Sequence, residues 1–123
     1  WQWFRDVLES DVYDTQGGTT QEGIHAGLMG GSIDIVMRNF VGLNTLENTI
    51  KINPNLPKNW QKIKLRLRYK ERWISLLITK NRVTILIQGP ATKFYTFPVK
   101  VSGRVYFLLL GKTYKISLKK KTT

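Results

Sequence analysis

The chain has 123 residues, no cysteine and a formal net charge of +12. That length suffices for one domain with a hydrophobic core, with or without an appended segment. Without cysteine the chain can form neither disulfides nor thiolate metal sites, which fits a reducing, cytoplasmic compartment. Apolar runs such as Val105 to Leu110 are too short to span a bilayer, and Trp1 to Arg5 show no signal-peptide pattern, so we expect no membrane partner.

The charge is divided unevenly along the chain. Residues 1–48 hold two basic and seven acidic side chains, whereas residues 49–123 hold eighteen basic and one acidic. The first segment therefore carries a net charge of −5 and the second a net charge of +17. This split predicts two segments with different neighbours, and an acidic partner for the second.

Two helices are predicted at the N-terminal end. Residues 2–13 have one apolar stripe formed by Trp3, Phe4, Val7 and Leu8, and Gln16-Gly17-Gly18 breaks that pattern. A second helix is expected from Thr19 to about Asn39. Thr19 and Glu22 match a capping box, with Thr19 as the N-cap.

The second predicted helix is unusually rich in glycine. Gly23, Gly27, Gly30 and Gly31 lie within it, and each costs about 1 kcal/mol in a helix interior. Gly23 and Gly27 share a face at i, i+4, which would let another helix approach closely. The chain offers only one other short helix, so this face predicts a packing partner outside the chain.

From Thr49 the apolar period changes from helical to two. Seven short runs separated by turn residues predict an antiparallel β-sandwich or barrel with one solvated face. The runs are Ile50–Ile52, Ile63–Tyr69, Ile74–Ile78, Val83–Ile87, Phe97–Val101, Val105–Leu110 and Tyr114–Leu118. Residues 40–48 form the expected connector. The predicted fold class is therefore α+β, mostly β.

One candidate site lies at the start of the second helix. It comprises Gly17, Gly18, Thr19, Thr20 and His25. Backbone N–H groups and the helix dipole converge at such a terminus, hydroxyls add donors, and an imidazole suits a bound anion. The alternative is an ordinary capped helix with a packed histidine. No metal site is expected, because there is one histidine and no cysteine.

Two charged groups offer weaker functional candidates. The first holds the carboxylates Asp6, Glu9, Asp11 and Asp14. Glycosidase chemistry needs a pair of carboxyls, but four acids on and after an exposed helix favour a solvated face. The second is a basic ridge with Trp60 and Trp73 near it. It comprises Lys62, Lys64, Arg66, Arg68, Lys70 and Arg72.

The basic ridge has several open interpretations. Cations near aromatic rings can hold single-stranded nucleic acid or another polyanion. However, Tyr69 has the parity of the apolar face and is expected in the core. A solvated face, or a face that docks on an acidic neighbouring domain, explains the ridge without nucleic acid. Sugar stacking on Trp60 or Trp73 is a third alternative.

The stretch from Asp11 to Leu43 resembles glycoside hydrolase family 65, which includes maltose, kojibiose and trehalose phosphorylases. Its core is Gly-Gly-Thr-Thr-x-Glu-Gly-Ile-His-x-Gly-x-Met-x-Gly, at residues 17–30. Ile52-Asn53-Pro54-Asn55-Leu56-Pro57, Trp60 and Leu65 to Tyr69 look like the start of that family's C-terminal β domain. The resemblance covers residues 11–88 and becomes general beyond Gly89.

The resemblance implies an architecture. Family members have an (α/α)6 barrel followed by a jelly-roll-like β-sandwich. Residues 1–48 would be the terminal barrel helices plus connector, and residues 49–123 would be the sandwich. The main partner would then be the remaining barrel and N-terminal domains of the same polypeptide. Because phosphorylases of this family are often dimers, the resemblance also allows a homodimer of the complete enzyme.

The resemblance also implies a chemistry. Phosphorylase members cleave α-linked glucose disaccharides with inversion, using phosphate as nucleophile and a Glu as general acid. That Glu would lie outside this chain, so no residue here is expected to be catalytic. Gly17, Gly18, Thr19, Thr20 and His25 resemble part of the phosphate-binding region. Inorganic phosphate would be a co-substrate and no other cofactor is implied; hydrolytic members use water.

Overall fold

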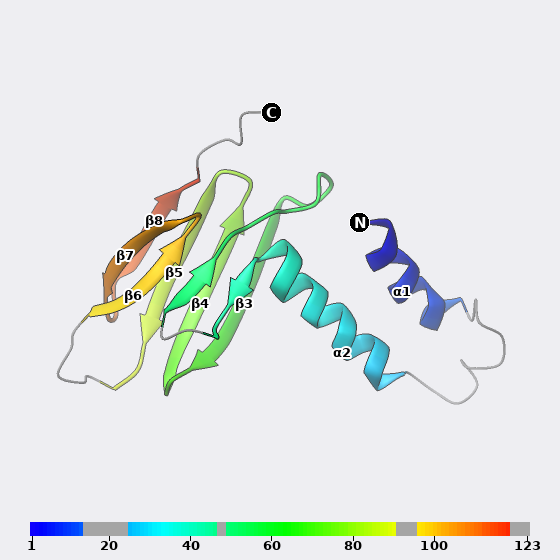
Figure 1. The fold of residues 1–123 in the computed structure, drawn as a ribbon, viewed down its shortest axis with the longest axis horizontal. Coiled ribbons are helices and arrows are strands. Elements are labelled where there is room, and N and C mark those ends of the chain that lie inside the picture. The colour runs from blue at the N-terminus through cyan, green and yellow to red at the C-terminus, as the bar shows by residue number, and fades with distance from the viewer. Residues whose placement is uncertain (14–24, 47–48, 91–95, 119–123) are drawn as a thin grey trace.

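In the computed structural model the chain forms a two-sheet β-sandwich joined to a helical segment (Figure 1). The structure describes residues 1–13, 25–46, 49–90 and 96–118. None of the helices in these ranges is long and apolar enough to cross a membrane.

The first sheet has the strand order β3-β4-β5-β8 and is antiparallel throughout. Its strands are β3 (Lys62–Tyr69), β4 (Arg72–Thr79), β5 (Arg82–Gln88) and β8 (Thr113–Ser117). Their period-two patterns place one parity in the core and the other in solvent, as the sequence predicted. The turn between β3 and β4 places Lys70 and Glu71 at positive φ.

The second sheet has the strand order β1-β2-β6-β7. Its strands are β1 (Leu43–Asn44), β2 (Ile50–Ile52), β6 (Thr96–Val101) and β7 (Arg104–Leu109). Two features differ from the sequence prediction. The strand β1 lies inside the expected connector, and β2 pairs with β6 in parallel, Ile50 opposite Val99. The sandwich is therefore not purely antiparallel.

The core lies between the two sheets. Its fully buried side chains are mainly β-branched residues whose stiff rotamers suit a pleated surface. They include Ile50, Ile52, Ile74, Ile78, Val83, Ile85, Ile87, Val99 and Val101. Because both sheets direct one apolar face inward, the sandwich buries the side chains of these two faces within its own chain.

The helical segment comprises α1 (Gln2–Val12), α2 (Ala26–Ile35) and a π-helical turn η2 (Val36–Phe40). The two helices lie beside each other on the β3 side of the sandwich (Figure 1). Only part of the predicted stripe on α1 is buried: Phe4 is in the core, whereas Trp3 is 84% exposed. The apolar stripe therefore extends beyond what the described chain covers.

An aromatic cluster joins these helices to the sandwich. Phe4 of α1, Phe40 of η2 and Trp60 before β3 meet edge to face, with ring centroids 5.3–5.9 Å apart. Trp1 packs on the same cluster, with its ring 6.0 Å from that of Trp60. Such contacts add about 0.5–1.5 kcal/mol per pair beyond area burial. The cluster therefore fixes the angle at which the helical segment leaves the sandwich.

Backbone contacts strengthen this joint. The π-helical turn closes with the N–H of Val41 donating to the carbonyl of Val36 at 2.9 Å. The N–H groups of Asn53 and Asn55 then donate to the carbonyls of Gly42 and Phe40. Gly42 has φ +64, and a Cβ there would overlap the backbone carbonyl of Asn53. Only glycine fits this close approach without a backbone shift.

Candidate functional site

The described part of the predicted anion site is His25. It is the N-cap residue of α2, with an extended backbone (φ −73, ψ 98), and its carbonyl accepts from the N–H of Met29 at 3.1 Å. Gly17, Gly18, Thr19 and Thr20 lie outside the described residues, as does the predicted capping box. Their role as a phosphate site stays a prediction.

The predicted helix boundary is wrong at His25. A single helix from Thr19 to Asn39 would need helical backbone at this residue, but α2 begins at Ala26. The glycine content gives a physical reason, because each glycine lowers helix stability and favours interruption of the helix. As a result His25 lies at a helix N-terminus, not within the helix.

The local electrostatics at His25 suit an anion. The first N–H groups of α2 lack intrahelical acceptors, and the helix dipole places partial positive charge at this end. No acidic residue lies in the first turn of α2, and His25 is half-buried. Chemically, backbone donors at a helix N-terminus of this kind are suited to an anion.

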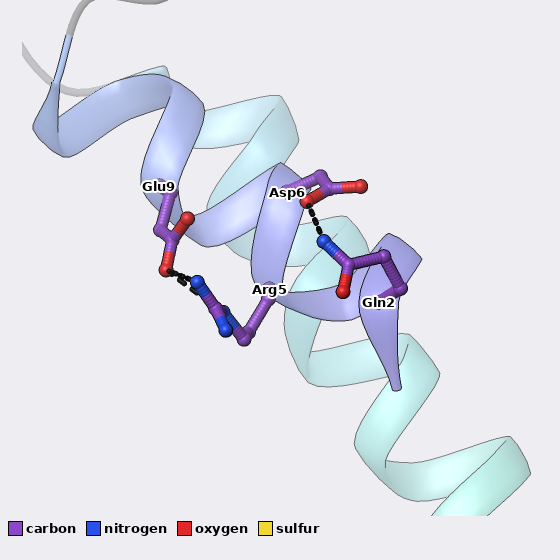
Figure 2. Close-up of polar contacts among 4 residues, drawn as sticks. All are labelled: Gln2, Arg5, Asp6 and Glu9. Atoms are coloured by element: carbon purple, nitrogen blue, oxygen red, sulfur yellow. Dashed lines mark hydrogen bonds and ion pairs between the residues drawn. The ribbon is translucent and has the colours of Figure 1, made fainter.

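The carboxylates of α1 form local surface pairs (Figure 2). Asp6 accepts a hydrogen bond from the amide of Gln2 at 2.8 Å, and Glu9 bonds Arg5 at 2.8–2.9 Å. The side chain of Asp11 and all of Asp14 lie outside the described residues. Asp6 and Glu9 are therefore part of a solvated helix face, as the sequence favoured.

A similar pair occurs at the end of the helical segment. Arg38 donates to Asp34 at 2.7 Å, one helical turn away. This hydrogen bond, together with the negative charge of Asp34, raises the pKa of Arg38 above its ordinary value. The pair is exposed and belongs to the helix surface.

Only four residues of the predicted basic ridge project from one face of a strand in the described structure. Lys62, Lys64, Arg66 and Arg68 project from one face of β3, whereas Arg72 reaches the ring of Phe97 at 5.1 Å. Tyr69 packs edge to face on Phe97, so its expected core position is confirmed. The ridge is thus a four-residue column on the outer face of the first sheet.

Both tryptophans near the ridge already contact other side chains of the chain. Trp60 is half-buried in the aromatic cluster with Phe4 and Phe40. Trp73 is exposed on the outer face, but the guanidinium of Arg66 lies 4.5 Å from its ring centroid. A base or sugar would have to displace Arg66 to stack there. The geometry therefore gives little support to nucleic-acid or sugar stacking.

A cleft of about 950 Å³ opens at one end of the sandwich. Asn53 and Asn55, the Ser102-Gly103 turn, and Tyr106 form part of its lining. The sequence predicted the turns but not that the fold brings them together. Among the described residues, those that line the cleft include no Asp, Glu or His, so they do not supply the carboxyl pair that glycoside cleavage uses.

The architecture and these surfaces define a class: a β-sandwich domain that follows a helical segment. The model of "Glycosyl hydrolase family 65, C-terminal domain" matches residues 43–108, from β1 into β7. The chain therefore belongs to glycosyl hydrolase family 65, which confirms the resemblance in the sequence.

Relatives with named activities agree with this assignment. The chain is 35% identical over 80% of its length to trehalose 6-phosphate phosphorylase of Lactococcus lactis. It is 34% identical over 85% of its length to kojibiose phosphorylase of Thermoanaerobacter brockii. In each case it spans 13% of the relative's length.

A solved structure shares the fold. A putative kojibiose phosphorylase from the human microbiome superposes with a TM-score of 0.75 at 24% identity. The superposition covers 95% of this chain and 15% of that protein. Because it includes nearly all of this chain, the helical segment and the sandwich share one arrangement with the larger protein.

Proposed function

We propose that the chain is the C-terminal part of an inverting α-glucoside phosphorylase or hydrolase that degrades a disaccharide. Relatives named as phosphorylases of trehalose 6-phosphate and kojibiose support this, as does the short share of each that the chain spans. The general-acid Glu would lie in the barrel, outside this chain. The lack of cysteine fits a cytoplasmic enzyme.

The exposure of apolar residues on helix α2 is the main structural observation that supports this proposal. Its sequence is AGLMGGSIDI, yet Ser32 is its one buried residue and Ile33 is 65% exposed. A Cβ added at Gly27, Gly30 or Gly31 would meet no atom within 4 Å in the described part of the chain. A helix this apolar, in which Asp34 is the one charged residue, is normally enclosed by other helices. The remaining barrel helices would supply that enclosure.

The sandwich would have a mainly structural role. The aromatic cluster and the hydrogen bonds from Asn53 and Asn55 hold η2 firmly, and η2 continues directly from α2. A sandwich with a sealed core can therefore set the direction of α2. By this route it would orient the end of the barrel while making no contact with the reacting bonds.

The start of α2 would contribute to the phosphate site. His25 and the N–H groups of α2, with Gly17, Gly18, Thr19 and Thr20, would bind inorganic phosphate as co-substrate. Basic residues from the barrel would complete the charge balance. In a hydrolytic enzyme the same turn would position water instead of phosphate.

The first test uses the chain alone. Incubated with phosphate and maltose, kojibiose or trehalose, it should form no β-glucose 1-phosphate, because it would lack the general acid. Appreciable formation of this product, measured by anion-exchange chromatography, would show that the chain carries its own catalytic acid and would contradict the proposal.

The second test concerns His25 in the complete enzyme. His25→Ala should raise the KM for phosphate roughly ten- to a hundredfold, the expected loss for a hydrogen bond to a charged group. The KM for the disaccharide should change little. Asp6→Asn, on the solvated face of α1, is the matched control and should leave both constants unchanged. An unaltered phosphate KM in His25→Ala would exclude His25 from the site.

A further inference from the structure

The cleft at one end of the sandwich has no role in the function proposed above. Its volume of about 950 Å³ lies in the range of small-molecule sites, about 300–1,000 Å³. The loop of residues 53–56, the Ser102-Gly103 turn and the end of β8 contribute to its walls. The lining combines apolar side chains with amides, hydroxyls and cations, which is the mixture that such sites present to a ligand.

The charge at the cleft is positive. Arg104 begins β7 opposite the buried Val101, so its side chain leaves from the inner face of the second sheet. Within the described part of the chain, no hydrogen bond or ion pair engages its guanidinium, and no acidic residue lines the cleft. The guanidinium is therefore available to an anion from outside the chain, and its fork of donors fits the oxygens of a phosphate.

A second cation lies at the same cleft. Lys80 is in the turn between β4 and β5, and its ammonium donates to the carbonyl of Lys58 at 2.8 Å. An ammonium has three donors, so two remain for a ligand. Two cations without a carboxylate in the described lining favour a ligand with negative charge.

The amides in the lining belong to a loop whose backbone is fixed. The N–H of Asn53 donates to the carbonyl of Gly42 at 3.0 Å, and the N–H of Asn55 donates to that of Phe40 at 2.9 Å. Both side chains are exposed and make no hydrogen bond within the described residues. A carboxamide offers two donors and an acceptor, which match neighbouring hydroxyl groups of a sugar.

Tyr106 adds an aromatic ring to the lining. It has the same parity on β7 as Arg104 and is half-buried. An aromatic side chain with a hydroxyl offers an apolar face to the C–H groups of a sugar ring and a polar tip to its hydroxyls. The lining therefore fits a ligand that has a sugar ring as well as negative charge.

The cleft is separate from the predicted anion site at His25. The segment from Ala26 to Phe40 is roughly 20 Å long at a rise of about 1.5 Å per residue. His25 precedes this segment, whereas the cleft residue Asn55 is bonded to Phe40 at its other end. A ligand in the cleft would not reach His25.

We propose that this cleft binds a phosphorylated sugar. Arg104 and Lys80 bind the phosphate, and the carboxamides of Asn53 and Asn55 bind the sugar hydroxyls. The assignment depends on the described residues of the sandwich and its loops, and it holds whichever reaction the complete enzyme performs.

Titration of the 123-residue chain with glucose 6-phosphate tests the site. The Kd should be on the order of 0.1–1 mM, as for a small ligand in an open cleft. In two-dimensional proton–nitrogen spectra, the amide signals of Asn53, Asn55 and residues 102–104 should shift. Glucose and inorganic phosphate should each bind at least about tenfold more weakly, because each makes only part of the contacts.

Two results of this titration would overturn the proposal. The first is the absence of saturable shifts up to about 10 mM glucose 6-phosphate. The second is inorganic phosphate that binds as tightly as glucose 6-phosphate, which would leave a bare anion site with no place for the sugar.

A pair of charge variants separates the cleft from the general basic surface. Arg104→Gln should weaken glucose 6-phosphate binding at least about tenfold, the expected loss for hydrogen bonds to a charged group. The matched control is Arg68→Gln, which removes the same charge from the outer face of β3. It should leave the Kd within about twofold of the wild type. Equal losses in the two variants would overturn the site, because the ligand would then respond to net charge alone.

Asn55→Ala tests the sugar contacts and keeps the backbone N–H that fixes the loop. It should weaken glucose 6-phosphate about three- to tenfold and leave the binding of inorganic phosphate unchanged. Unshifted signals outside the cleft will show that the fold is intact. Unchanged binding of glucose 6-phosphate, or an equal loss for both ligands, would contradict the assignment of the sugar hydroxyls to this loop.

Discussion

The sandwich and the helical segment differ in how far they bury their apolar residues. In the sandwich Ile50, Ile78 and Ile85 are fully buried between two sheets of the same chain. In α2 the residue Ile33 is 65% exposed, and three glycines face open space. The contrast shows that the sandwich finds its packing partner within the chain. Within the described part of the chain, α2 packs mainly on α1 and η2, and most of its residues stay exposed.

The largest expected effect is a difference in the free energy of unfolding between a core variant of the sandwich and a variant of α2. Ile85→Ala should lower the free energy of unfolding by about 2–5 kcal/mol, because it removes a buried side chain and leaves a cavity. Ile33→Ala should change it by less than about 0.5 kcal/mol, because that side chain lies in solvent. Urea unfolding of both variants measures the difference. Equal losses would mean that α2 is packed as tightly as the sandwich.

The next effect falls at the joint between the regions. Phe4→Ala should cost about 3 kcal/mol, since it removes a buried ring that contacts Phe40 and Trp60. The loss should appear mainly as early melting of α1, followed by unfolding of the sandwich at its usual temperature. Far-ultraviolet circular dichroism, which reports helix and sheet separately, can follow both steps. Val12→Ala, at an exposed position on α1, is the control and should melt as the wild type does.

The smallest effect is on the surface of α1. Glu9→Gln removes the ion pair with Arg5 and should cost about 0.3–0.5 kcal/mol at low salt. The difference from wild type should disappear near 1 M salt, because the pair is partly exposed. Thermal melts at two salt concentrations measure this. A loss above about 2 kcal/mol would mean that Glu9 has a role beyond the helix surface.

Local sequence patterns predicted most of the sandwich. Strict alternation in residues 63–69 and 83–87 predicted β3 and β5, because a half-buried strand repeats every two residues. The short strand β1 gave no such signal, since two residues cannot show a period. The parallel pairing of β2 with β6 depends on segments far apart in the chain, which alternation does not specify.

The joint and the candidate site were harder to predict. Phe4, Phe40 and Trp60 are far apart in sequence, so their meeting depends on the whole fold. The start of α2 at Ala26 was missed because the capping-box pattern at Thr19 competes with a glycine-rich stretch that weakens the helix. The family motif of residues 17–30, by contrast, predicted the family to which the chain belongs.

The glycine face of α2 offers the most direct test of the central claim, that this helix is built to pack against segments outside the chain. In the 123-residue chain, Gly30→Ala should stabilise α2 by about 0.5–1 kcal/mol, because the added methyl group meets no described atom. In the complete enzyme the same substitution should lower the free energy of unfolding, because neighbouring helices would approach closely there. Equal stabilisation of both proteins would contradict the account.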